Sequence, residues 1–107
     1  MVPDGYMRVA TASQLPEGKG RKCVVGDEEV ALWHVDGRFY AISNVCAHQH
    51  VSALHAGIRE GLQVTCPMHG WTYSLESGIA ASGNGRVRVF RVLVEGDSVY
   101  IEVPESS

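Results

Sequence analysis

Two short segments of this chain each pair a cysteine with a histidine, and no other feature constrains the fold as strongly. Cys46 and His48 stand two positions apart, Cys66 and His69 stand three apart, and seventeen residues separate the two pairs. Side chains at such spacings in tight loops can point at one small object. The sequence therefore predicts a fold that brings two loops together around a shared metal centre.

The donor atoms limit which metal centre this can be. Two thiolates and two imidazoles can hold a two-iron, two-sulfide cluster with both histidines on one iron. A structural zinc ion also accepts two cysteines and two histidines, but common zinc motifs group like ligands, whereas each loop here is mixed. The pattern favours the iron–sulfur cluster, and a zinc-stabilised binding module without a redox role stays as the alternative.

The second segment runs Cys66-Pro67-Met68-His69-Gly70-Trp71, and with the first it resembles the Rieske iron–sulfur family. The resemblance implies one [2Fe–2S] cluster per chain, with Cys46 and Cys66 on the inner iron and His48 and His69 on the outer iron. In the family the histidine edges face a docking partner. A neutral imidazole brings no negative charge to iron, so the histidine side should take the electron.

Four further residues are candidates for supporting the cluster: His50, Gly70, Trp71 and Tyr73. Gly70 permits a close backbone approach after His69. His50 stands where the family usually has glycine, and histidine is among the residues that better tolerate a positive φ. Tyr73 matches a position whose hydroxyl bonds to a cysteine sulfur in some members. A core aromatic side chain is an equally good interpretation of Tyr73.

Three departures bear on the reduction potential. One group of the family joins its loops by a disulfide, and the matching positions here are Val51 and Met68. Trp71 stands where the same group has serine, which is similar to ferredoxins and oxygenases of the family. These features predict a potential toward the lower part of the Rieske span of roughly −150 to +300 mV. Residues 78–85 lack the proline of a covering loop, which predicts a looser cover.

The rest of the chain has the punctuation of an all-β domain, with short apolar runs between glycine-containing turns. We expect strands at residues 21–25, 29–35, 38–42, 62–65, 87–94 and 98–103, and single turns of helix near 12–15 and 53–56. The resemblance implies an antiparallel β sandwich or barrel base carrying a small inserted subdomain. We expect one domain over residues 1–107, with the base at about 5–43 and 76–104 and the cluster-binding subdomain at about 44–75.

The net charge and the cysteine count indicate which partners and which cellular compartment to expect. Nine basic and twelve acidic residues give a net charge of −3, so no nucleic-acid partner is expected. We see neither an apolar run of membrane-spanning length nor an export signal, and Cys23 has no disulfide partner after the motif takes two cysteines. These observations predict a cytoplasmic protein without a membrane partner.

The resemblance implies a one-electron carrier, not itself an enzyme, that passes electrons from a reductase to an oxygenase. The second possibility is a small relay subunit that partners the large subunit of a nitrite reductase-like complex. Four residues outside the motif have structural interpretations: His34 as a structural or surface residue, His55 as a surface or loop residue, Trp33 as core and Cys23 as a small buried side chain.

Overall fold

The structure, a computed structural model, describes residues 2–45, 54–67, 71–81 and 85–103. In these ranges the chain is built from strands and two short 3₁₀ segments, which confirms the expected all-β class. In chain order they are β1 (Tyr6–Thr11), η1 (Ala12–Gln14), β2 (Gly20–Val25), β3 (Glu28–Val35), β4 (Arg38–Ser43), η2 (Leu54–Ala56), β5 (Ile58–Glu60), β6 (Gln63–Thr65), β7 (Thr72–Ser74), β8 (Val89–Phe90), β9 (Val92–Glu95) and β10 (Ser98–Glu102). No helix in the described ranges is long and apolar enough to cross a membrane.

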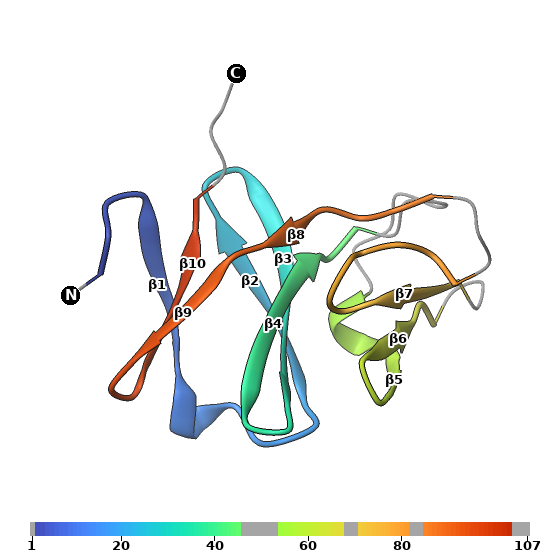
Figure 1. The fold of residues 1–107 in the computed structure, drawn as a ribbon, viewed down its shortest axis with the longest axis horizontal. Coiled ribbons are helices and arrows are strands. Elements are labelled where there is room, and N and C mark those ends of the chain that lie inside the picture. Colours follow the sequence, from blue (N-terminus) through green and yellow to red (C-terminus); the bar gives the residue numbers. More distant parts are fainter. Residues whose placement is uncertain (1, 46–53, 68–70, 82–84, 104–107) are drawn as a thin grey trace.

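Two antiparallel sheets form what we call the β base, with strand orders β1-β10-β9 and β2-β3-β4-β8 (Figure 1). The β3–β4 hairpin pairs continuously from Val30 opposite Ser43 to Val35 opposite Arg38. Its turn residues Asp36 and Gly37 both have positive φ, 51° and 76°. A two-residue turn with positive φ at both positions matches the twist of the flanking strands, so this dipeptide sets the register.

The hairpin β3–β4 is the middle layer of the molecule, because both of its faces are covered. Val30 and Leu32 point into a core between the two base sheets, which we call the inner core. Ala31, Trp33 and Val35 point the other way, into a second core described below. Successive side chains of a strand alternate between faces, so a strand covered on both sides reads as one continuous apolar run.

A third sheet, β5-β6-β7, lies beside the β base at the right of Figure 1. We call η2, this sheet and residues 78–81 the small-sheet region. Its buried side chains pack against β3 and β4 in the shared core, which holds Ala31, Trp33, Val35, Ile42, Leu54, Val64, Cys66, Tyr73, Leu75, Ala80 and Val87. The small-sheet region is thereby fixed to one face of the middle layer.

The strand expected at residues 87–94 is wrong as a single element. It is split at Arg91 into β8, which pairs with β4, and β9, which pairs with β10. The Arg91 carbonyl accepts a hydrogen bond from the Glu102 N–H at 3.0 Å, so pairing changes sheet at this residue. The apolar pattern continues through the crossing because both halves bury side chains in the β base.

Three strands were not anticipated from the sequence: β1, β5 and β7, the last with only three residues. In β1 the side chains are mostly exposed or half-buried, and β10, its partner, lies at the far end of the chain. In β5 no side chain is fully buried. A strand without a buried face leaves no alternation of apolar and polar residues, so local sequence alone does not reveal it.

Candidate metal centre

The predicted site residues fall into two groups. Cys66, Trp71 and Tyr73 lie in the described part of the chain. The other predicted ligands and supporting residues lie outside the described residues: Cys46, His48, His50, His69 and Gly70. The geometry of the site is therefore built from the segments that flank the two ligand loops.

Asn44 connects the two ends of the first ligand loop through hydrogen bonds. It directly follows β4, is fully buried, and its own N–H donates to the Glu29 carbonyl at 2.9 Å. Its carbonyl accepts from the Leu54 N–H at 3.1 Å, and its side-chain Oδ1 accepts from the His55 N–H at 2.6 Å. One amide residue thus ties the start of the 45–53 segment to its end, so the loop leaves and returns at one point.

The second ligand loop is closed by the β6–β7 hairpin. Thr65 and Thr72 are opposite each other, and their hydroxyls are hydrogen-bonded at 2.8 Å. One position further on, the Cys66 N–H donates to the Trp71 carbonyl at 2.7 Å. The ladder thus continues through Cys66 and Trp71, so Cys66 stands at the end of the hairpin, where the second ligand loop begins.

Cys66 fits the role of a cluster ligand. Its side chain is fully buried in the shared core, together with Tyr73 from the adjacent strand. Cys66 differs from a core cysteine because it directly follows the β6 strand, where the second ligand loop begins, and a hydrophobic shell around a metal ligand limits solvent access to it. Both interpretations of Tyr73, as a core aromatic and as a hydroxyl near a cysteine sulfur, agree with its complete burial.

A third segment packs against the ligand hairpin. The Ala81 N–H donates to the Thr72 carbonyl at 2.8 Å, and Tyr73 forms a bridge with Ala80. Gly78 has a φ of 75°, and a Cβ there would lie 2.1 Å from the Val87 carbonyl oxygen, so only glycine fits. The base of the predicted covering loop is therefore hydrogen-bonded to β7, while the predicted looseness at its tip, residues 82–84, lies outside the described residues.

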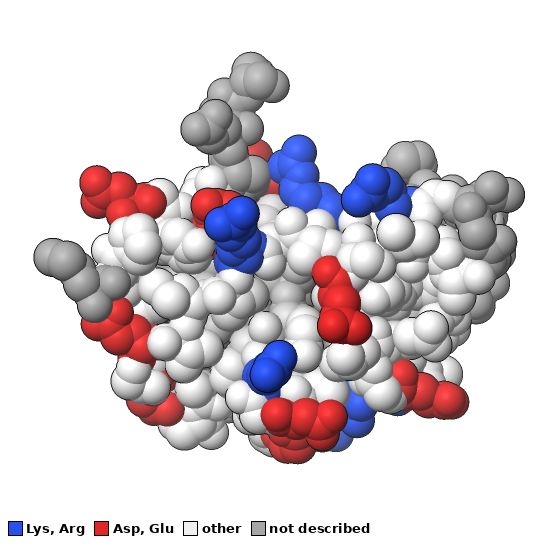
Figure 2. All heavy atoms as spheres, viewed as in Figure 1, with Lys and Arg blue, Asp and Glu red and all other residues white. Residues whose placement is uncertain are grey.

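The site region carries little charge. Between Phe39 and Leu75 the sequence has only Arg59 and Glu60 as charged residues. On the face drawn in Figure 2, charged atoms lie mainly over the β base and along the lower edge, and the described atoms at the right-hand end are mostly uncharged. Long-range electrostatic attraction at this end of the molecule is accordingly weak.

The sequence analysis interpreted His55 as a surface or loop residue, and this interpretation is wrong. It lies in η2, half-buried, and its ring Nδ1 is 3.1 Å from the Oδ1 of Asn44. Because an amide oxygen only accepts, Nδ1 carries the proton. His55 therefore supports the first loop from the side, through the same Asn44 that closes the loop. The sequence analysis did not identify Asn44 as a functional residue. Its position, as a polar residue between a predicted strand and the predicted ligand Cys46, could have indicated this role.

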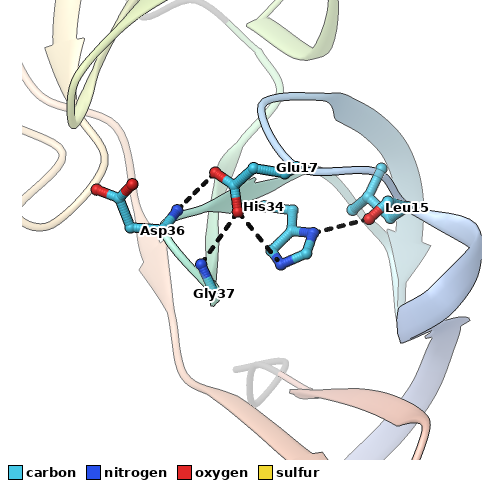
Figure 3. Close-up of polar contacts among 5 residues, drawn as sticks. All are labelled: Leu15, Glu17, His34, Asp36 and Gly37. Atoms are coloured by element: carbon cyan, nitrogen blue, oxygen red, sulfur yellow. Dashed lines mark hydrogen bonds and ion pairs between the residues drawn. The ribbon is translucent and has the colours of Figure 1, made fainter.

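His34 has a structural role, in agreement with its predicted interpretation (Figure 3). Its Nδ1 donates to the Leu15 carbonyl at 2.8 Å, and its ring stacks on Phe39 with centroids 4.2 Å apart. Its other nitrogen lies 3.7 Å from the Glu17 carboxylate. That carboxylate accepts hydrogen bonds from the N–H groups of Gly37 and Asp36, which lower the pKa of Glu17 most, with smaller contributions from the charges of His34 and Arg59.

Cys23 and Trp33 are both buried, as predicted. Cys23 belongs to the inner core, and burial raises the pKa of its thiol. A thiol kept neutral in an apolar core is a poor nucleophile and a poor metal ligand. The cysteine left over from the motif is thus a packing residue.

Comparison with known proteins gives a family match over most of the chain. The model of the Rieske [2Fe-2S] domain matches residues 5–92. A 3-phenylpropionate/cinnamic acid dioxygenase ferredoxin subunit of Photorhabdus laumondii is 30% identical over 99 residues, covering 91% of this chain and 93% of that protein. The similarity therefore extends over nearly the full length of both proteins.

Solved structures show the same architecture. The chain aligns with a structure described as the complex of reduced oxygenase and oxidized ferredoxin in carbazole 1,9a-dioxygenase, with a TM-score of 0.85, 27% identity and coverage of 98% and 99%. It also aligns with a crystal structure described as a nitrite reductase (NADPH) small subunit, with a TM-score of 0.83, 20% identity and coverage of 90% and 96%. At 20% identity the second likeness concerns the fold alone.

Proposed function

This chain belongs to the Rieske [2Fe–2S] domain family, and we propose that it passes single electrons from a reductase to an oxygenase through one cluster held by Cys46, His48, Cys66 and His69. The observation that carries the proposal is the buried Cys66, which stands at the base of a hydrogen-bonded hairpin loop in a chain with this family match. The other three ligands follow from their positions in the motif.

The chain's own residues have distinct tasks in this proposal. When bound, the cluster accepts and releases one electron, with the charge mainly on the iron that carries the histidines. Asn44 and the β6–β7 ladder tie together the described ends of the two ligand loops, so these ends keep their spacing as the charge changes. The shared core excludes water from the cysteine side of the site.

Domain organisation follows the same logic. We propose that residues 44–75 form the cluster-binding subdomain, inserted between base segments at about 5–43 and 76–104. Two features support this division: the small-sheet region packs on one face of β3–β4, and the inner core lies within the β base. Residues 78–81 bond to β7, so they accompany the subdomain in space while leading back to β8.

The proposed partners are a reductase as donor and an oxygenase as acceptor. The dioxygenase ferredoxin subunit is similar along almost its whole length, and the carbazole dioxygenase ferredoxin is described in complex with its oxygenase. We propose contact through the tip around His48 and His69, and a cytoplasmic location. A buried cysteine without a disulfide partner supports a reducing compartment.

Cluster content and electron transfer test the proposal together. Purified protein should contain about two irons and two acid-labile sulfides per chain, and dithionite should produce the EPR signal of a reduced Rieske centre. The reduced protein should then lose its electron to a dioxygenase component while O₂ is consumed. Stoichiometric zinc with no EPR signal after reduction, in protein made with ample iron, would remove the iron–sulfur assignment.

The nitrite reductase-like alternative makes a different prediction. A relay subunit of that kind should bind stably to a large reductase subunit, whereas a carrier should dissociate from its partners between transfers. Size-exclusion chromatography of the protein from its native host separates the two. Elution as part of a large stable complex would favour the subunit role and would leave the cluster assignment intact.

A further inference from the structure

The 3₁₀ segment η2 lies between the two predicted ligand loops along the chain. The first loop ends at Leu54, the first residue of η2, and the strands β5 and β6 then lead to Cys66. Figure 1 shows η2, in yellow-green, between the β base and the sheet β5-β6-β7. The contact between the end of η2 and β6 therefore determines how far the end of the first loop lies from the start of the second.

Gly57 is the residue at this contact. It directly follows η2, and its N–H donates to the Leu54 carbonyl at 3.2 Å. A Cβ on Gly57 would lie 2.5 Å from the Thr65 carbonyl oxygen and 2.7 Å from Cγ2 of Val64. The backbone that leaves η2 therefore lies directly against β6, one residue before Cys66.

The backbone conformation at Gly57 does not itself require glycine. Gly57 is not among the residues with positive φ, the region in which glycine is favoured over residues with a side chain. The nearest neighbour of a Cβ at this position is a backbone oxygen, which cannot rotate away as the end of a flexible side chain could. The close approach to β6 is therefore the reason that this position needs glycine.

The size of the conflict can be compared with the tolerance of a metal site. Ordinary contacts of a Cβ begin at 3.4 Å, so an alanine at position 57 needs about 1 Å more space from the Thr65 carbonyl. Either η2 or β6 must move by that amount. Ligands of a metal site have to be held within roughly 0.5 Å of their productive geometry. A shift of this size between the two loops exceeds that tolerance.

The position of η2 itself is fixed from the side of the β base. A Cβ on Gly20 would lie 2.8 Å from the His55 carbonyl oxygen, so the backbone of β2 lies against η2. Asn44 accepts hydrogen bonds from the N–H groups of Leu54 and His55, and the Leu54 side chain is completely buried in the shared core. Because η2 is held in this way, the contact at Gly57 fixes β6, and with it the start of the second loop, relative to the end of the first.

We propose that Gly57 is a positioning residue for the cluster, because its backbone contact with Thr65 sets the spacing between the two ligand loops. Both residues of this contact lie outside the two cysteine–histidine pairs. The proposal rests on the proposed function, since only a centre held by both loops depends on their spacing. A side chain at position 57 should therefore change the electronic properties of the centre and not only the stability of the fold.

The test compares Gly57→Ala with wild type in the full chain with its cluster. The EPR g values and the reduction potential should both differ from those of wild type, because they depend on how the ligands are held. Loss of the visible absorbance under chelator should be at least about tenfold faster. Wild-type g values and potential in Gly57→Ala would overturn the role of Gly57. Wild-type protein without a Rieske EPR signal would instead remove the proposed function itself.

Gly61→Ala is the matched control for strain. Gly61 lies in the turn between β5 and β6 with a φ of 57°, and a Cβ there would have no neighbour within 4 Å. The substitution strains the turn and should lower the melting temperature. It should leave the g values and the potential unchanged, because the spacing of the loops is not affected. Changed g values in Gly61→Ala would show that they follow stability alone, which would overturn the proposal.

Val64→Ala keeps the test decisive if Gly57→Ala fails to fold. It removes the side-chain neighbour of Gly57 and leaves the backbone contact with Thr65 in place. Truncation of a buried side chain lowers stability, but the g values should remain those of wild type. Altered g values in Val64→Ala would mean that core side chains, and not the backbone contact, set the spacing of the loops, and this result would also overturn the proposal.

Discussion

The β base and the small-sheet region differ in strand length and in how their buried side chains are packed. In the β base, β3 has eight residues, β2 and β4 have six each, and the inner core is made entirely of base side chains. In the small-sheet region each strand has three residues. Its buried side chains all belong to a core that it shares with β3 and β4. The β base therefore has a core of its own. The small-sheet region depends for its stability on packing against the β base and on the proposed cluster between the two ligand loops.

This contrast suggests a division of labour. Long strands with complete ladders resist local opening, whereas short strands with long loops open at lower free energy. A redox centre needs donors held firmly in loops that stay accessible to a partner. The molecule combines both by placing the loops on a rigid middle layer and tying each loop at its base. The following predictions test how far the two regions are separable.

Removing Cys66 should have the largest effect. Cys66→Ala should abolish the cluster, because a thiolate ligand is lost, and should destabilise the small-sheet region because the loops lose their common anchor. Iron content should fall close to zero. Hydrogen exchange should speed up in β5–β7 while β2–β4 stays protected.

Cys23→Ala is the matched control for that substitution. Both cysteines are buried, but Cys23 lies in the inner core. The control should retain full iron content and lose only about 1 kcal/mol of unfolding free energy, from the deleted sulfur atom. A variant lacking Cys66 that keeps its cluster would show that another residue replaces it as ligand.

A pair of core truncations compares the two regions directly. Leu54 lies in the shared core and Ile101 in the inner core, and both are completely buried. Each substitution by alanine should cost about 2–5 kcal/mol of unfolding free energy. Only Leu54→Ala should also accelerate loss of the cluster absorbance under chelator, because Leu54 ends the first ligand loop. Equal rates of cluster loss in the two variants would mean that the regions unfold as one unit.

Asn44→Ala should have an intermediate effect. It leaves the His55 N–H and its ring N–H without their shared acceptor, which costs about 1–3 kcal/mol for buried groups. Cluster loss under chelator should be faster than in wild type but slower than in Leu54→Ala. Asn44→Asp keeps an acceptor oxygen and should partly restore retention, which separates the hydrogen bond from simple side-chain volume.

How far the sequence determines this architecture differs between the same two regions. The strands of the β base carry apolar runs and a diagnostic Asp36-Gly37 turn, so β2, β3, β4 and β10 could be predicted almost to their ends. The split at Arg91 could not, because both halves are apolar and only the pairing partners differ. The exposed β5 has no buried face to reveal it.

The sequence predicts the position of the site but not the residues that support its loops. Ligand spacing identifies Cys66, and its burial agrees with that prediction. The roles of Asn44 and His55 depend on a contact across eleven positions, formed when the chain returns to the end of β4. Such a contact has no local signature, because asparagine is equally at home in an exposed turn. The roles assigned to Cys46, His48 and His69 remain predictions from the motif.

Glu17 offers a smaller effect, confined to the β base. Hydrogen bonds from the Gly37 and Asp36 N–H groups lower its pKa below the ordinary 4.5. A carboxyl whose pKa is lower in the folded state stabilises the fold above its ordinary pKa, and this contribution is lost as pH falls through the lowered value. In Glu17→Gln the melting temperature should therefore fall less steeply below about pH 4.5 than in wild type. The visible spectrum of the variant at pH 7 should match that of wild type. An unchanged acid profile would mean that the carboxylate contributes nothing to the hairpin.

The smallest expected effect is that of salt on partner docking. Charge lies mainly on the β base, and the chain between Phe39 and Leu75 has only Arg59 and Glu60, so steering by charge should contribute little if partners meet the ligand loops. The second-order rate of reduction by a reductase should fall less than about threefold between 50 and 300 mM salt. Arg86→Glu, on the exposed stretch before β8, should leave this rate nearly unchanged, whereas His50→Ala should lower it. A steep fall with salt, together with a large loss in Arg86→Glu, would place docking on the β base. The two regions would then divide the work differently, with the base guiding the partner and the loops only delivering the electron.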